Sequence, residues 1–324
     1  MKRLFDIKRT KMVDELAFGH NPMKFGKTFL AFFLITIISN VATNSITNTP
    51  ILLNHVLSMI ASGSYTDLTT ALTKFLESPY VTLPWWATPL QLFGGIFAII
   101  AVCVYMKKFE KRKISAIGIR KNGAVLEVIL GLLIGLVLAA VLFLASIFSG
   151  AVYVYRGIDI RLGFYVIGYI IFAFSEELLV HGFFMSMLAR DMKPMTAIIV
   201  SSILYSIAGF SVYSIPSFLN TFAFSMLLGI FVFKRGSIWG ASAIKLAWCL
   251  ISGVILGSPV FSYYPIISVL VPKYNVSEIL IGSSTSGFEG GLLMTVILAV
   301  AISILLLLKT KKSEQSAVKI EYFN

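Results

Sequence analysis

The class of fold follows from residues 162–189, which read LGFYVIGYIIFAFSEELLVHGFFMSMLA and lie between Arg161 and Arg190. The run is long enough to cross a bilayer, for which about 20 mostly apolar residues suffice. Two adjacent acids, Glu176 and Glu177, interrupt it near its middle. A charge at that depth costs about 2.5–3.5 kcal/mol and is usually kept for a function or a structural pairing. We therefore predict a membrane helix that carries a polar site.

The remainder of the chain has the same apolar character. Of 324 residues, 57% are hydrophobic and 13% are charged, whereas globular chains carry about 25% charged residues. The sequence therefore predicts an all-α, polytopic transmembrane bundle of about eight spans. These spans are placed at residues 27–43, 88–106, 123–154, 162–189, 195–213, 217–234, 237–257 and 289–308.

Two connecting segments have their own expectations. The short apolar piece at 50–61 is expected to lie as a helix in the outer interface, because it is too short to cross. The proline-bearing stretch 258–288 is either a plain loop or a short re-entrant piece. Paired glycines at i, i+4, such as Gly131 and Gly135, predict close helix packing.

The distribution of cations predicts the orientation. If the N-terminus is cytoplasmic, 22 of the 27 Lys and Arg residues fall on inner segments and four on outer ones, and Lys245 lies within a span. This asymmetry places both termini in the cytoplasm. The net charge of +12 is then explained by contact with the lipid bilayer, and no nucleic-acid partner is expected. We divide the chain into an N-terminal part (1–112), a membrane domain (113–308) and a polar tail (309–324).

The ionisable residues inside predicted spans are the candidates for function. Glu127 lies near a cytoplasmic end and is expected to reach the headgroups. Adjacent helical residues point about 100° apart, so Glu176 and Glu177 face different sides, whereas Glu177 and His181 share one face at i, i+4. One carboxylate is thus expected to face a cavity and the other to brace a neighbouring helix. Lys245 is expected to neutralise one of the two glutamates as a buried ion pair.

These residue types leave several chemistries open. Two glutamates and a histidine suit a proton relay, a general base for hydrolysis, or an interhelical clamp. A zinc site needs three or four ligands in tetrahedral reach, and the spans supply few beyond Cys249 and Glu289. No H-E-x-x-H spacing is present. We expect no metal and no other cofactor.

Three motifs in the second half of the chain resemble a known family. Residues 175–184, SEELLVHGFF, resemble the first motif, E-E-x-x-x-R, of the CPBP family of CAAX-protease and bacteriocin-processing intramembrane endopeptidases, also called Abi. Residues 201–209, SSILYSIAG, resemble the second motif, F-x-x-x-H. Residues 236–249, GSIWGASAIKLAWC, resemble the third, H-x-x-x-N/D. The similarity extends from about residue 113 to residue 298 and implies a bacterial cell membrane.

The resemblance also implies roles that this sequence fills only in part. In the family, the first glutamate activates water with a second-motif histidine, and a third-motif histidine and asparagine stabilise the oxyanion. Glu176 and Glu177 match the two glutamates. The other positions differ, with these residues in place of the family's Arg, Phe, His, His and Asn: His181, Tyr205, Gly209, Lys245 and Cys249.

The departures decide the expected function. A general base contributes about 10²–10⁴-fold and one oxyanion donor about 10²–10³-fold, so their loss removes most of a protease's rate advantage. We expect a degenerate member that binds a membrane protein or peptide as a scaffold, immunity or regulatory protein. The alternatives are an active endopeptidase, with Glu176 as base and His181 or Lys245 assisting, and a carboxylate-relay transporter.

Overall fold

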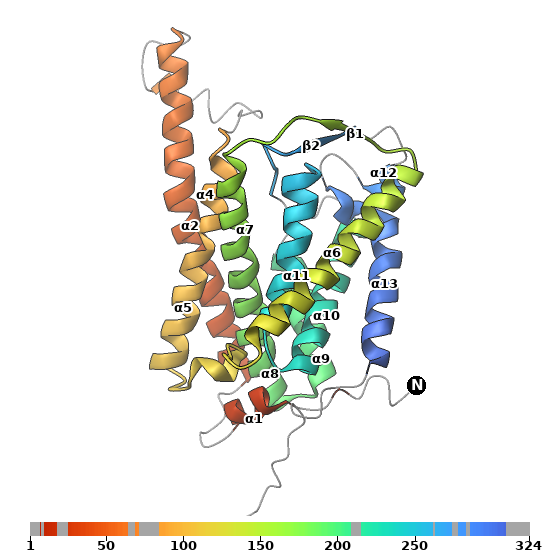
Figure 1. Cartoon of the computed structure of the whole chain (residues 1–324). Helices are drawn as coiled ribbons and strands as arrows, with labels where there is room; N and C mark the ends of the chain where they lie inside the picture. The colour runs from red at the N-terminus through yellow and green to blue at the C-terminus, as the bar shows by residue number, and fades with distance from the viewer. Residues whose placement is uncertain are drawn as a thin grey trace, which may run out of the picture.

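The computed structural model describes residues 7, 10–17, 25–63, 69–70, 84–208, 215–261, 263–273, 278–282 and 286–308. The chain is a bundle of roughly parallel helices with one small sheet at one end (Figure 1). Within the described residues, five helical segments have the length and apolar composition of a membrane span, and three apolar helices are shorter. Together they correspond to the eight expected spans, and the protein is an all-α, multi-pass membrane protein.

The elements follow in chain order, given with their bounds. They are α1 (Lys11–Ala17), α2 (Phe25–Ala61), α4 (Ala87–Phe93), α5 (Gly95–Lys108), η1 (Ile114–Ile117), α6 (Ala124–Phe148), β1 (Val152–Tyr155), α7 (Leu162–Glu177), η2 (Leu178–Met185), α8 (Ser186–Asp191), α9 (Pro194–Ala208), α10 (Ile215–Arg235), α11 (Trp239–Cys249), η3 (Leu250–Ile255), β2 (Leu270–Lys273), α12 (Glu278–Ile281), η4 (Phe288–Gly290) and α13 (Leu292–Leu307).

The first span differs from its prediction. The segment 50–61 is not a separate interfacial helix, because α2 continues through it as one helix of 37 residues with Pro50 inside. At 1.5 Å per residue α2 is about 55 Å long, more than a hydrocarbon core of about 30 Å. Its second half extends beyond the rest of the bundle in Figure 1. Threonine hydroxyls bonded to carbonyls four residues earlier, as at Thr43 and Thr49, satisfy polar groups along this helix.

The connecting stretch 258–288 also holds structure that the sequence did not reveal. β2 pairs antiparallel with β1, with Val152 opposite Lys273 and Tyr155 opposite Leu270. The predicted third span therefore ends at Phe148, and the chain then turns into the sheet. Before β2, the stretch brings Phe261 and Tyr263 to the cavity between the helices. This segment therefore covers the end of the bundle that carries the sheet (Figure 1).

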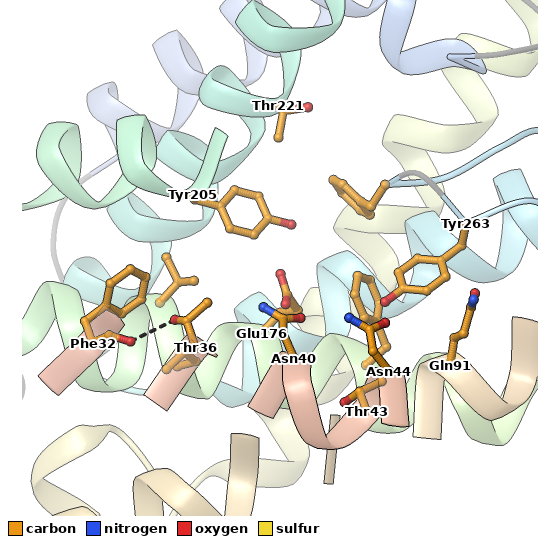
Figure 2. Close-up of a pocket in the computed structure, with 14 residues that line it drawn as sticks. Phe32, Thr36, Asn40, Thr43, Asn44, Gln91, Glu176, Tyr205, Thr221 and Tyr263 are labelled. Atoms are coloured by element: carbon orange, nitrogen blue, oxygen red, sulfur yellow. Dashed lines mark hydrogen bonds between the residues drawn. The ribbon is translucent and has the colours of Figure 1, made fainter. Parts of the chain in front are cut away.

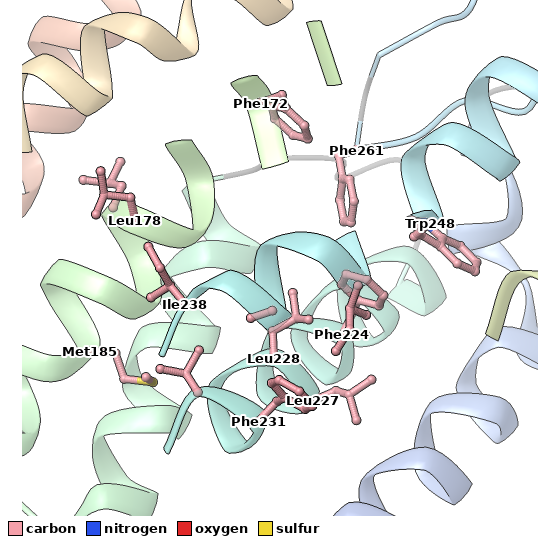
Figure 3. Packing of buried hydrophobic residues seen from close by; sticks show 14 of the residues in the cluster. Phe172, Leu178, Met185, Phe224, Leu227, Leu228, Phe231, Ile238, Trp248 and Phe261 are labelled. Atoms are coloured by element: carbon pink, nitrogen blue, oxygen red, sulfur yellow. The ribbon is translucent and has the colours of Figure 1, made fainter. Parts of the chain in front are cut away.

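Close packing of α6 on α11 fixes the helices that carry the site. A Cβ atom added at Gly131 would lie 2.7 Å from Ala243 Cβ and against the Gly240 carbonyl oxygen. The glycine spacing thus makes the close contact that it predicts. Apolar side chains from η2, α10 and α11 form the core of the bundle. Figure 3 shows members of this core, among them Met185, Phe224 and Trp248.

The helices of the N-terminal part pack directly on the membrane domain. α4 and α5 lie against α7, and α2 lies against α4, α5 and η2. The polar residues of α2 therefore share a cavity with Glu176 of α7. The proposed boundary at residue 112 stays a prediction, and the tail at 309–324 lies outside the described residues.

Candidate functional site

The two glutamates lie where α7 changes into a π-helix. Glu177 is the last residue of α7, and η2 continues from Leu178 as a π-helical segment of eight residues. Such segments are rare and are often found at functional sites. The side chain of Glu176 is 30% exposed and that of Glu177 is 1% exposed. As expected from their angular separation, Glu176 faces a cavity while Glu177 points into the core.

Lys245 of α11 lies beside both acids. Its Nζ atom is 3.6 Å from Glu176 Oε2 and 3.5 Å from Glu177 Oε1. It also donates a 2.8 Å hydrogen bond to the hydroxyl oxygen of Tyr205. The expected pairing of this lysine with the acids is therefore present, and it involves both acids instead of one.

Three aromatic rings complete the surroundings of the Lys245 ammonium. Its Nζ atom lies 4.5 Å from the ring centroid of Tyr205, 5.0 Å from that of Phe261 and 5.2 Å from that of Phe172. A cation this close to ring faces is stabilised by their quadrupoles, more strongly when it is desolvated. The cage, defined here as Glu176, Glu177 and these three rings, holds a fully buried ammonium.

Glu177 also belongs to a second chain of contacts. Its Oε2 atom lies 2.6 Å from His181 Nδ1, and His181 Nε2 lies 3.2 Å from Ser225 Oγ on α10. The order of groups is that of a Ser-His-acid triad. All three side chains are buried, however, and Ser225 lies within a continuous helix. A carbonyl substrate therefore has no access to the Ser225 hydroxyl. The two contacts of His181 instead connect α7 and η2 to α10.

The cavity beside Glu176 has a volume of about 320 Å³. Figure 2 shows Tyr205, Thr221 and Tyr263 around Glu176, with Asn40 and Asn44 of α2 near it. Pockets of about 300–1,000 Å³ are typical of small-ligand sites. Lys245 is not among the lining residues, so its charge reaches the cavity only through Glu176 and Tyr205.

The remaining predicted residues have structural positions. Cys249 is a fully buried free cysteine. Gly209 lies outside the described residues. Glu127 does not reach the headgroups as a free carboxylate, because Arg235 of α10 binds both of its oxygens at 2.6–3.0 Å. The ion pair joins the first turn of α6 to the last residue of α10, a contact that no sequence spacing reveals.

Two aromatic residues that the sequence analysis did not single out, Phe261 and Tyr263, line one wall of the cavity. Phe261 has a positive φ of 46°, which is strained for a residue with a side chain. Its amide N–H donates to both carboxylate oxygens of Glu289 at 3.0 Å, which holds this conformation. Burial raises the pKa of Glu289 to about 7, although the hydrogen bonds from the Phe261 N–H and the positive charge of Lys245 each lower it. The sequence singles out Glu289 only as a possible metal ligand, and its contact with Phe261, 28 residues earlier, could not be read from it.

Tyr263 supplies a neutral phenol to the same wall. Burial raises its pKa well above the ordinary value of 10, and the negative charge of Glu176 raises it further. The phenol therefore stays protonated at any physiological pH and is able to donate a hydrogen bond. It lines the cavity together with Glu176.

The arrangement does not suit a bound metal ion. In the described part of the chain, no three His, Cys, Asp or Glu side chains converge as metal ligands. At the acids, one Glu177 oxygen meets His181 and the other meets the Lys245 ammonium. A divalent cation there would be repelled by that ammonium. We derive no chemical step through a metal.

Comparison with protein families finds a match over the segment that carries most of this site. Residues 159–251 match the family model described as type II CAAX prenyl endopeptidase Rce1-like. This segment is therefore similar to the CAAX-protease (CPBP) family, and the match supports the resemblance that the motifs indicate. The match covers α7, η2, α9, α10 and α11, and therefore every residue of the Lys245 cage except Phe261. No curated protein is similar enough to this chain to be a match.

Proposed function

We propose that this member of the CAAX-protease family binds a membrane protein or peptide without cutting it, as a scaffold, immunity or regulatory protein. The observation that carries the proposal is the Lys245 ammonium at 3.6 Å from Glu176. An ammonium has three donors and no acceptor, so it does not take a proton from water. The position where the family has a catalytic imidazole therefore holds a group that neutralises the first glutamate.

The position of His181 supports the same conclusion. Both of its ring nitrogens have partners, Glu177 and Ser225, and the side chain is 1% exposed. Among the described residues, no imidazole contacts Glu176. Because none of the described residues gives Glu176 an imidazole partner, cleavage by these residues would depend on one carboxylate that already faces a cation. Binding in the cavity needs no such partner.

A second candidate function has one observation in its favour. Tyr205 accepts a hydrogen bond from Lys245, so its own O–H is free to donate into the cavity beside Glu176. A donor polarised by an ammonium suits an oxyanion. An active endopeptidase would then use Glu176 as base and Tyr205, instead of His181 or Lys245, as the group next to the substrate.

One comparison separates the two candidates. The purified full chain in lipid vesicles is incubated with a library of quenched fluorescent membrane peptides, beside its Glu176→Ala variant and an Asp159→Asn control. We expect no cleavage that depends on Glu176. Cleavage that the control retains and Glu176→Ala loses would establish the endopeptidase. Solute uptake that depends on Glu176 would instead indicate the carboxylate-relay transporter.

We further propose that the chain lies in the cell membrane with both termini in the cytoplasm. The excess of cations on the inner segments supports this orientation. The arrangement of the ends agrees with it, since α1 and the C-terminal end of α13 lie at the same end of the bundle (Figure 1).

A further inference from the structure

One face of α2 is polar at membrane depth. Thr36, Asn40, Thr43 and Asn44 recur at helical spacing and all line the cavity beside Glu176. Asn40 lies about 22 Å along the helix axis from Phe25, which is within a hydrocarbon core of about 30 Å. α2 lies outside the segment that matches the family model. This polar face is therefore a feature of the chain that the family match does not include.

The carboxamides on this face have unused hydrogen-bonding capacity. The hydroxyls of Thr36 and Thr43 donate to carbonyls of their own helix at 2.8 Å. In contrast, among the described residues the side chains of Asn40, Asn44 and Gln91 of α4 make no hydrogen bond to protein. Asn40 and Asn44 are exposed and Gln91 is half-buried, so these groups are open to a ligand. At membrane depth, polar groups without partners are costly. Three such groups on one cavity are a reason for a ligand to bind there.

The opposite wall adds polar groups but no cation. It presents the Glu176 carboxylate, the Tyr205 and Tyr263 hydroxyls and the Thr221 hydroxyl, and no Lys or Arg lines the cavity. A phosphate group would therefore meet a carboxylate and no cation, which disfavours a lipid headgroup. A ligand with alternating donors and acceptors and no charge fits both walls.

We propose that Asn40, Asn44 and Gln91 bind the backbone of an extended, uncharged peptide segment and hold it against Glu176. Each residue of such a segment carries one N–H and one C=O, both of which need partners at membrane depth. A carboxamide both donates and accepts, so it satisfies either group. The inference rests on the proposed function and names its ligand and the residues that select it.

The test uses a defined probe. Fluorescently labelled acetyl-trileucine amide is titrated against the full chain in lipid nanodiscs, and the binding to empty nanodiscs is subtracted. An analogue with every backbone nitrogen methylated has the same apolar side chains but lacks the N–H donors. We expect the native chain to bind the probe at least 10-fold more tightly than the analogue.

Matched variants locate the binding. The double variant Asn40→Leu, Gln91→Leu is expected to lose at least 10-fold in affinity for the probe. Asn40→Gln, which keeps the carboxamide, is expected to retain most of it. Asn48→Leu removes a carboxamide from an exposed position of the same helix outside the cavity, and less than a 2-fold change is expected. Each variant is first shown to be monodisperse with a native melting curve.

The outcomes also separate this inference from the proposed function. If the native chain does not bind the probe, or if the double variant binds it as tightly as the native chain does, the inference that these carboxamides bind a peptide backbone is wrong. Equal binding of the methylated analogue overturns it as well. If the probe binds through these residues and is then hydrolysed in a way that needs Glu176, the inferred peptide site is correct and the proposed non-cleaving function is wrong.

Discussion

The ammonium of Lys245 has no exposed surface, and the carboxylates beside it are what make its burial tolerable. Taking a charge out of water costs several kcal/mol, which attraction to a nearby opposite charge offsets in part. Glu177 is equally buried, whereas Glu176 retains access to the cavity. Replacement of Lys245 should therefore destabilise the protein mainly because Glu177 loses its positive partner, and less because Glu176 does.

The first prediction concerns that ion pair. Lys245→Met is expected to destabilise the protein by about 3–5 kcal/mol, because it leaves Glu177 buried beside one remaining partner, His181. Adding Glu177→Gln to Lys245→Met should recover much of the loss, and adding Glu176→Gln should recover less. The measurement is unfolding in mixed micelles of rising SDS content. A double variant no more stable than the worse single variant would contradict the pairing.

The second prediction concerns the buried acid beside Phe261. The pKa of Glu289 is raised from 4.5 to about 7, so the folded protein holds this proton more tightly than the unfolded chain does. Stability is then fully present below pH 4.5 and falls as the pH rises to 7. The fall should be about 3 kcal/mol, at about 1.4 kcal/mol for each pKa unit.

The pH effect is isolated by comparison with a variant. In Glu289→Gln, the difference in unfolding free energy between pH 5 and pH 7 should be smaller than in the native chain by about 2 kcal/mol, the part of the fall that lies in this pH range. All other titrating groups are common to both proteins and cancel. The same slope in both proteins would show that Glu289 is ionised in the fold.

Between elements, the contact of α6 with α11 is the most sensitive to side-chain size. Gly131→Ala places a methyl group 2.7 Å from Ala243 Cβ and against a backbone carbonyl, so the helices must separate. Overpacking of this kind costs about 1–3 kcal/mol. The control is Gly163→Ala near the start of α7, where a Cβ atom would meet nothing within 4 Å.

The two glycine variants should therefore change stability in opposite directions. Gly163→Ala removes backbone freedom from the unfolded chain and gains helix propensity, worth about 0.5–1 kcal/mol. Melting temperatures of the purified proteins in one detergent give the comparison. Similar effects of the two substitutions would mean that α6 and α11 are not in close contact.

For the whole molecule, the distribution of charge predicts a topology. A green fluorescent protein fused after residue 324 should fluoresce, and alkaline phosphatase at the same position should be inactive, because the C-terminus is expected in the cytoplasm. Fusions after residue 62, at the end of α2, should give the reverse result. Activity of the phosphatase at the C-terminus would invert the orientation and move the small sheet to the cytoplasmic side.

Local composition and spacing were sufficient to predict the class of fold and one contact of the site. Apolar runs and their flanking cations are sufficient for an all-α bundle of about eight spans, since hydrocarbon leaves a chain few ways to satisfy its backbone. The i, i+4 spacing put Glu177 and His181 on one face, and they are in contact. The motif residues indicated the family whose model matches residues 159–251.

Only the tertiary structure decided what meets across helices distant in the chain. The Lys245 cage joins α7, α9, α11 and the loop residue Phe261, and Glu127 pairs with Arg235 across α6 and α10. The packing of α2 against α4, α5 and η2 brings its carboxamides to the cavity. Such contacts depend on crossing angles and depth, which the packing of whole helices sets and local sequence does not.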